Sequence, residues 1–271
     1  MKTSTSLSVQ YDNIFSPFPG SQWQEGLQWV KESGFDAVEI ILSDPELVDR
    51  KLLLRSLERL DLPVSTISTG QAMGLENLSL VSPSRQIREL TLERLRRDID
   101  FSVLLGRPHV TIGLIRGRGG QNDRQIEVSL LKDSLKRIAD YAQKNDVTLN
   151  LEAINRYECS YLNSSDETLQ IIQEIGSPQC MGVLYDTFHS NMEDENMEEA
   201  IRNLKGHITN VHLADSNRRL PGEGHIDFRA LIAALEQSDY AGYVALEVLN
   251  RPSALHIRKN AQASMHYVLG R

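Results

Sequence analysis

Short apolar segments alternate with longer amphipathic segments along the whole chain. Two of the apolar segments, at 181–186 and 207–213, carry a side chain able to bind a metal at or next to their carboxyl ends, Asp186 and His212. An amphipathic segment with helical spacing, Glu193–Leu204, lies between them. A strand, a helix and a second strand, with a polar ligand at the far end of each strand, are typical of a βα unit that carries a functional site.

The same alternation is repeated along the chain and predicts eight strands and eight helices. The predicted strands are Leu7–Gln10, Ala37–Leu42, Val64–Ser68, Val110–Leu114, Thr148–Glu152, Gly182–Asp186, Ile208–Leu213 and Tyr243–Val248. The predicted helices are Trp23–Ser33, Asp49–Leu60, Ser84–Leu105, Arg124–Asn145, Asp166–Ile175, Glu193–Leu204, Phe228–Gln237 and His256–Leu269. The strands read as apolar on both sides, which is typical of a parallel sheet covered by helices.

Eight such units close into a barrel of about 250 residues, because consecutive parallel strands need crossover helices. No proline-rich or Ser/Gly-rich linker interrupts the 271 residues. We therefore predict an α/β fold with a single domain over residues 1–271, a (β/α)8 or TIM barrel. A doubly wound open sheet is the alternative, but no predicted strand is followed by the glycine-rich dinucleotide loop of that fold.

Composition narrows the class of protein. Hydrophobic residues make up 40% of the chain and the formal net charge is −8, with a pI of about 5.4. A nucleic-acid surface needs clustered basic side chains, so we expect no nucleic-acid partner. No apolar run approaches the roughly 18 residues of a membrane span, and the first residues lack the apolar core of a signal peptide. Cys159 and Cys180 are too few for a disulfide framework. We expect a soluble, cytoplasmic protein with free thiols and no membrane partner.

Four side chains able to bind a metal stand at the predicted carboxyl ends of the last four strands, where such barrels carry their catalytic residues. They are Glu152, Asp186, His212 and Glu247, and their spacings of 34, 26 and 35 residues are each about one βα unit. Three carboxylates and one imidazole suit a divalent ion such as Mn²⁺, Mg²⁺ or Co²⁺. A salt bridge within the barrel is the alternative for any one acid, but it does not account for all four positions.

These residues lie in stretches that resemble a known family. The stretches are LEAINRYE at 151–158, YDTFHSNMEDE at 185–195, VHLADSNRRLPGEGHIDF at 211–228 and ALEV at 245–248. They resemble the ketose 3-epimerases (D-tagatose and D-psicose 3-epimerases) among the xylose-isomerase-like TIM-barrel sugar isomerases and epimerases. The N-terminal half, with VEIILSDPELVD, STGQA and IGLIRGR, is more similar to the 5-keto-L-gluconate epimerases. Val248 departs from the family, which has a proline there, so we expect a different loop after the eighth strand.

The resemblance implies a metal-dependent epimerase that inverts the carbon next to the ketone of a keto sugar acid or a ketohexose. Glu152, Asp186, His212 and Glu247 would bind the metal, and Glu152 and Glu247 would also be the acid and base. Inversion removes a proton from one face of the carbon and adds one to the other, through a cis-enediolate that the metal stabilises as a Lewis acid. Two carboxylates on opposite sides can serve as base and acid. Homo-oligomers are common in that family, so a dimer or tetramer is compatible with this chain.

The resemblance further implies that Glu158, His189 and Arg218 hold substrate oxygens. Simpler alternatives are a surface loop histidine for His189 and an ion pair with Arg156 for Glu158. For Arg218 the alternative is a solvated loop arginine, and the neighbouring Arg219 is the less favoured candidate for the functional role.

The loop after the fourth predicted strand, LIRGRGGQNDRQ at 114–125, is rich in glycine and arginine. Its glycines permit positive φ, which favours a mobile exposed lid. The sharper hypothesis is that Arg116 or Arg118 pairs with a substrate carboxylate, which a guanidinium matches bidentately. Gln71, in STGQA after the third strand, is a further candidate for a substrate contact, and a plain turn is its alternative.

Three other functions fit parts of the sequence. An aldose–ketose (or hydroxypyruvate-type) isomerase of the same superfamily would move a proton between neighbouring carbons instead of inverting one. An endonuclease-IV-like repair nuclease shares the fold but uses a multi-zinc, histidine-richer cluster, which seven histidines and an acidic pI do not favour. A non-catalytic sugar-binding barrel would not need both candidate acid/base glutamates.

Overall fold

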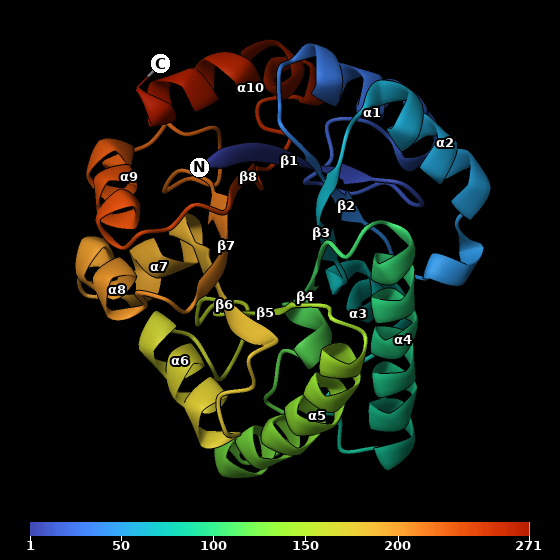
Figure 1. The fold of residues 1–271 in the computed structure, drawn as a ribbon. Coiled ribbons are helices and arrows are strands. Elements are labelled where there is room, and N and C mark those ends of the chain that lie inside the picture. Colours follow the sequence, from blue (N-terminus) through green and yellow to red (C-terminus); the bar gives the residue numbers. More distant parts are fainter. Residues whose placement is uncertain (271) are drawn as a thin grey trace.

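The computed structural model describes residues 1–270, whose eight strands close into a parallel barrel in sequence order, surrounded by helices (Figure 1). The strands are β1 (Lys2–Ser8), β2 (Val38–Ile41), β3 (Val64–Ser68), β4 (His109–Ile112), β5 (Leu149–Glu152), β6 (Met181–Asp186), β7 (Ile208–Leu213) and β8 (Tyr243–Leu246). Pairing of β8 with β1 closes the barrel. The predicted (β/α)8 fold is confirmed, and the open sheet is excluded.

Ten α-helices accompany the strands in residues 1–270. They are α1 (Trp23–Glu32), α2 (Arg50–Leu60), α3 (Gly70–Glu76), α4 (Arg85–Leu104), α5 (Arg124–Lys144), α6 (Ser165–Glu174), α7 (Thr187–Glu193), α8 (Met197–Asn203), α9 (Phe228–Gln237) and α10 (Ala254–Leu269). Side-chain caps start several of them: Asp49 accepts from the Leu52 N–H before α2, and Ser84 accepts from the Ile87 N–H before α4. Such caps satisfy N–H groups that have no partner within the helix.

Three elements differ from the sequence-based prediction. β1 begins at Lys2 and not at Leu7, because alternating serine and threonine in KTSTSLS form a buried strand with little hydrophobic signal. The helix predicted over 193–204 is the shorter α8, and a further helix that was not predicted, α7, begins directly after Asp186. The STGQA segment is not a plain turn, since α3 begins at Gly70 within it.

The interior of the barrel is polar, although both faces of the strands are buried. The strand register places Ser6 beside Glu39 and Thr111 beside Asn150, and all four side chains are buried. Because side chains alternate along a strand, their apolar neighbours point outward. The hydrophobic core therefore lies between the barrel and the helices and includes Leu7, Ile40, Val110 and Leu151.

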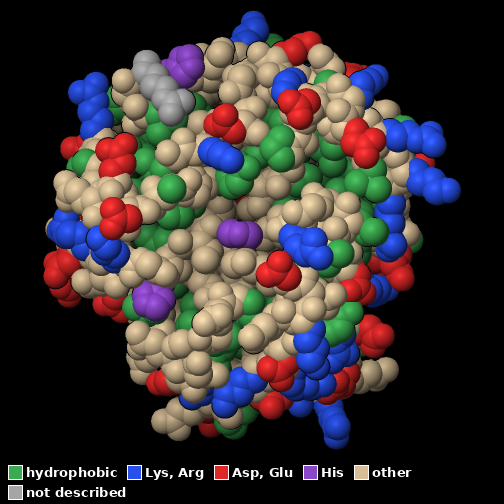
Figure 2. All heavy atoms as spheres, in the orientation of Figure 1, with side chains coloured by type: hydrophobic (Ala, Val, Ile, Leu, Met, Phe, Trp, Pro, Cys, Tyr) green, Lys and Arg blue, Asp and Glu red, His purple; other side chains and the backbone are tan. Residues whose placement is uncertain are grey.

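The carboxyl ends of all eight strands lie on one rim of the barrel, because the strands are parallel. In Figure 1 the strands follow one another clockwise from β1 to β8. Right-handed crossovers give a clockwise order when a barrel is viewed from the amino-terminal ends of its strands. Figure 1 therefore shows the face opposite the carboxyl rim. Figure 2 shows the same face, with acidic and basic side chains interspersed around its edge. Cys159 and Cys180 are both free, as predicted. No helix in residues 1–270 is both long and apolar enough to cross a membrane.

Candidate active site

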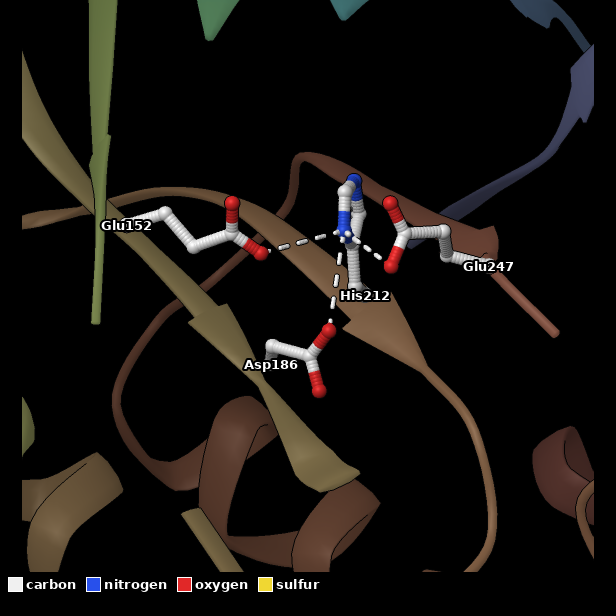
Figure 3. Close-up of side chains that lie close together, drawn as sticks. All are labelled: Glu152, Asp186, His212 and Glu247. Atoms are coloured by element: carbon white, nitrogen blue, oxygen red, sulfur yellow. Dashed lines mark ion pairs between the residues drawn. The ribbon is translucent and has the colours of Figure 1, made fainter. Parts of the chain in front are cut away.

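Glu152, Asp186, His212 and Glu247 come together at the carboxyl rim of the barrel (Figure 3). Glu152 and Asp186 end β5 and β6, His212 is the last residue but one of β7, and Glu247 directly follows β8. One ligand atom of each residue lies within 4.8 Å of those of the other three. His212 Nδ1 is 3.8 Å from Glu152 Oε1, 3.8 Å from Asp186 Oδ2 and 3.7 Å from Glu247 Oε2. The four side chains that the strand-end spacing predicted to converge therefore do lie close together.

The buried atoms of this cluster fit a divalent cation. His212 Nδ1 and Asp186 Oδ2 are buried and have no hydrogen-bond partner within residues 1–270, which is costly unless another group satisfies them. The other oxygen of Asp186, Oδ1, accepts from the N–H groups of Phe188 (2.7 Å) and His189 (3.1 Å) at the start of α7. This cap fixes the carboxylate so that Oδ2 faces the cluster. Carboxylate oxygens and one imidazole nitrogen are ligands that Mn²⁺, Mg²⁺ and Co²⁺ share.

The two glutamates have opposite protonation tendencies. Burial and the facing Glu247 carboxylate raise the pKa of Glu152 well above its usual value. Burial also acts to raise the pKa of Glu247, but His212 and Arg218 outweigh it and hold that pKa at about 2. For His212, burial acts to lower the pKa, and the carboxylates of Glu39 and Glu247 raise it to well above its usual value. The surroundings of Glu152 therefore favour its protonated form, and those of Glu247 favour its ionised form.

A glycine makes room for the Glu152 side chain. Gly113 directly follows β4, the strand next to β5. A Cβ atom on Gly113 would overlap with Glu152 Oε2. This residue is therefore part of the construction of the site, although the sequence analysis did not single it out.

Glu39 on β2 is a buried partner of the cluster that the sequence analysis missed. Its Oε2 lies 3.0 Å from Nε2 of His212, across the barrel. The sequence signal was an acidic residue in the middle of an otherwise apolar predicted strand, Ala37–Leu42. Such a position needs a polar partner, because a charged group is rarely buried without one.

His189 points its Nε2 atom toward the cluster. Its ring Nδ1 lies 2.8 Å from the amide nitrogen of Asn155 and also accepts from the backbone N–H of Asn155, at 3.4 Å. The ring proton therefore belongs on Nε2, which is 4.0 Å from both Glu152 Oε1 and Asp186 Oδ2. Burial lowers the pKa of His189, so the ring is neutral at neutral pH. His189 is not a surface histidine; it presents one N–H group to the cavity.

Arg218 joins the cluster to Glu158. Its Nη2 donates to Glu247 Oε2 at 3.1 Å, and its Nη1 donates to Glu158 Oε1 at 2.9 Å. The guanidinium lies between the rings of Phe15 and Phe188, 4.5 and 4.7 Å from their centroids. Arg218 is therefore neither solvated nor freely mobile. Glu158 pairs with Arg218 and not with Arg156, which instead binds Glu193.

The structure corrects the expectation that Arg116 is available to a substrate carboxylate. Its side chain is fully buried, and its guanidinium donates to the backbone carbonyls of Glu152, Tyr161 and Leu162. It also stacks on the ring of Tyr161, 4.7 Å from the centroid. Arg116 therefore ties the loop after β4 to the segment after β5. The position looked exposed because the surrounding sequence is rich in glycine and charge.

Gln71 and Arg118 do line a cavity of about 370 Å³ above the cluster. The cluster side of this cavity includes Glu152, Glu158, His189, Arg218 and Glu247. Its other side is formed by α3 and by the loops after β1 and β4, and includes Ile14, Phe15, Met73, Leu75 and Leu114. One nitrogen of Arg118, Nη1, donates to the backbone carbonyl of Glu158. The cavity thus joins the candidate metal ligands to a wall that is largely apolar.

A parallel (β/α)8 barrel with a cluster of candidate metal ligands at its carboxyl rim is typical of barrel enzymes, which carry their active sites at that rim. The chain belongs to the xylose isomerase-like TIM barrel family, whose sequence profile matches residues 27–268. It is 33% identical to an L-ribulose 3-epimerase from Mesorhizobium japonicum over 84% of this chain and 75% of that protein. It is 26% identical to a 3-dehydro-D-guloside 4-epimerase from Escherichia coli, over 82% of this chain and 86% of that protein. A solved L-ribulose 3-epimerase structure matches with a TM-score of 0.81 and 27% identity, covering 99% and 92% of the two chains.

Proposed function

We propose that the protein is a metal-dependent epimerase that inverts the carbon next to the ketone of a keto sugar. The observation that carries this proposal is the placement of two glutamates, Glu152 and Glu247, on either side of one cluster of candidate metal ligands. The names of the relatives, a ketose 3-epimerase and a keto-glycoside 4-epimerase, support the same reaction type.

The two glutamates act as a pair, because they lie on either side of the cluster. One of them accepts the proton from the substrate carbon, and the other returns a proton to the opposite face. The two exchange roles in the reverse reaction. A divalent ion held by Glu152, Asp186, His212 and Glu247 would supply Lewis-acid stabilisation of the negative charge that develops on the substrate oxygens.

The surrounding residues orient the substrate and the base. The Nε2–H of His189 is placed to donate a hydrogen bond to a substrate oxygen beside the cluster. Arg218 holds Glu247 in position and is itself fixed between two aromatic rings. Glu158 and Gln71 line the same cavity and are the remaining candidates for contacts with substrate hydroxyl groups.

We favour a neutral keto sugar, such as a ketohexose, over a keto sugar acid. A substrate carboxylate needs a cation, and Arg116 is buried among carbonyls while both ends of Arg218 are paired with glutamates. Arg118 is the remaining arginine that lines the cavity. A keto sugar acid is therefore the alternative substrate, and its carboxylate would have to pair with Arg118.

The metal, compartment and assembly are further parts of the proposal. The candidate ions are Mn²⁺, Mg²⁺ and Co²⁺, because the donor set suits all three. We expect a cytoplasmic enzyme with a small sugar substrate and no nucleic-acid or membrane partner. A homo-oligomer, a dimer or tetramer, is compatible with it.

A substrate panel tests the proposal. The protein, treated with EDTA and reloaded with Mn²⁺, is incubated with ketohexoses, keto hexonates and 3-keto glycosides, and the products are identified by chromatography and NMR. We expect an epimer of at least one keto sugar, loss of turnover in EDTA and recovery with Mn²⁺. Aldose products alone would favour the aldose–ketose isomerase, and turnover that survives EDTA would contradict a metal-dependent reaction.

A further inference from the structure

We propose that Glu39 is a positioning residue of the candidate metal site, which fixes the tautomer and orientation of His212 so that Nδ1 is free to bind the metal. The inference rests on the proposed metal site. It concerns a residue outside the four-ligand cluster, on the opposite side of the barrel in β2.

The Glu39 carboxylate is held on both oxygens. Its side chain is completely buried. Oε1 accepts from the hydroxyl of Ser6 at 3.0 Å and from the hydroxyl of Ser68 at 2.8 Å. These serines belong to β1 and β3, the strands on either side of β2. Oε2 is thereby directed at Nε2 of His212, at 3.0 Å.

This contact decides which ring nitrogen carries the proton. The Glu39 carboxylate is placed as an acceptor, since its other oxygen already accepts from two hydroxyl groups, and its contact with Nε2 is then a hydrogen bond when Nε2 carries a hydrogen. In the neutral ring the lone pair is then on Nδ1. Nδ1 is also the atom that faces Glu152, Asp186 and Glu247 at 3.7–3.8 Å and has no protein partner in the described chain.

The opposite tautomer would work against metal binding. A hydrogen on Nδ1 would point at three carboxylates and occupy the position that a cation needs. It would also leave the buried Glu39 oxygen facing a bare nitrogen lone pair, an unfavourable contact for two acceptors. Carboxylates that accept from the far nitrogen of a ligand histidine typically strengthen metal affinity by about 10–100-fold. The geometry places Glu39 in that role.

A purely structural role for Glu39 would have a different signature. Removal of a buried, hydrogen-bonded carboxylate can destabilise the barrel whatever its effect on a metal. Metal affinity and the position of the ring proton therefore separate the two roles, since a structural group would change stability without changing either of them. Asp98 on α4 offers a matched control, because it is another fully buried carboxylate and lies outside the cluster.

The test measures Mn²⁺ binding to EDTA-treated protein by titration calorimetry, together with thermal unfolding with and without Mn²⁺. In the Glu39→Gln and Glu39→Ala variants we expect the Kd for Mn²⁺ to rise by about 10–100-fold and the metal-dependent shift in Tm to shrink. The control Asp98→Asn should keep the wild-type Kd. A Kd within twofold of wild type in both Glu39 variants would overturn the inference.

A second measurement does not depend on the variants folding. In wild-type protein loaded with Mg²⁺, the ¹⁵N shifts of His212 should show the hydrogen on Nε2. A hydrogen on Nδ1 would overturn the inference even if neither Glu39 variant can be prepared. Failure of the wild-type protein to bind Mn²⁺, Mg²⁺ or Co²⁺ is a separate outcome that would remove the proposed function itself.

Discussion

Gly113, directly after β4, and Glu152, at the end of β5, are so close that a single methyl group on Gly113 would occupy the place of the Glu152 carboxylate. The first prediction follows from this proximity. Gly113→Ala should displace Glu152, and so reduce turnover and weaken Mn²⁺ binding while the barrel remains folded. Steady-state kinetics, Mn²⁺ titration and circular dichroism measure the three effects.

The matched control for this prediction is Gly74→Ala. Gly74 lies in α3 on the wall of the cavity, where an added Cβ would have no atom within 4 Å. Alanine also favours the helical conformation over glycine by about 0.5–1 kcal/mol. The control should keep activity and match or exceed wild-type stability. Equal activity of the Gly113 and Gly74 variants would contradict the role given to Gly113.

The two glutamates should be needed individually. Glu152→Gln and Glu247→Gln keep the size of the side chain but remove the ability to exchange a proton, so each should lower kcat by ~10²–10⁴-fold or more. Metal content is measured in parallel, because both residues are also candidate ligands. Near-normal turnover in either variant would remove the two-base mechanism.

The two arginines of the loop after β4 should behave differently. Arg116→Met would leave three carbonyl acceptors without their donor, at a cost of at least about 3 kcal/mol in the free energy of unfolding. Arg118→Met should leave stability unchanged, since Arg118 is exposed, and should raise KM for a keto sugar acid if one is turned over. Urea unfolding and kinetics separate the two. Equal stability of the two variants would contradict the structural role of Arg116, and an unchanged KM for Arg118→Met would remove its pairing with a carboxylate.

Asp98 should make stability depend on pH. Burial raises the pKa of Asp98 well above its usual value, against the opposing effect of Arg94, and within residues 1–270 neither of its oxygens has a hydrogen-bond partner. The folded state therefore keeps a proton that the unfolded chain releases above about pH 3.9. Between that pH and the pKa of Asp98 in the folded state, the free energy of unfolding of the wild type falls by up to ~1.4 kcal/mol per pH unit. The Asp98→Asn variant lacks this titrating group and should not show that loss.

The measurement for Asp98 is the difference in urea unfolding free energy between wild type and Asp98→Asn, taken at pH 4 and at pH 7. The variant should gain on the wild type as the pH rises. A difference that stays constant, or changes in the opposite direction, would show that Arg94 and Arg97, whose charges both act to lower the pKa of Asp98, keep it ionised.

The sequence could predict the barrel and its four-residue cluster because both depend on short-range patterns. Apolar runs give the strands, and strand ends give the rim, so Glu152, Asp186, His212 and Glu247 follow from one rule. The first strand was misplaced because its inward positions are serines, which carry no hydrophobic signal.

The supporting residues could not be predicted in this way. Glu39 meets His212 from 173 positions away, and the geometry of the closed barrel alone brings them together. Arg116 lies among glycines and charges that suggest exposure, yet the turn at 114–116 buries it among carbonyls that belong to another loop. Local sequence describes which conformations a segment prefers, but the partners of its polar atoms are set by tertiary contacts.

The central claim is that a carbon is inverted when one of Glu152 and Glu247 removes its proton and the other returns a proton to the opposite face. Turnover in D₂O tests this claim most directly. The Mn²⁺-loaded protein is incubated with the ketohexose that the substrate panel identifies, and the product is analysed by NMR and mass spectrometry. We predict deuterium at the one carbon next to the ketone whose configuration is inverted. An inverted product formed without deuterium, or deuterium incorporated only into an aldose, would contradict it.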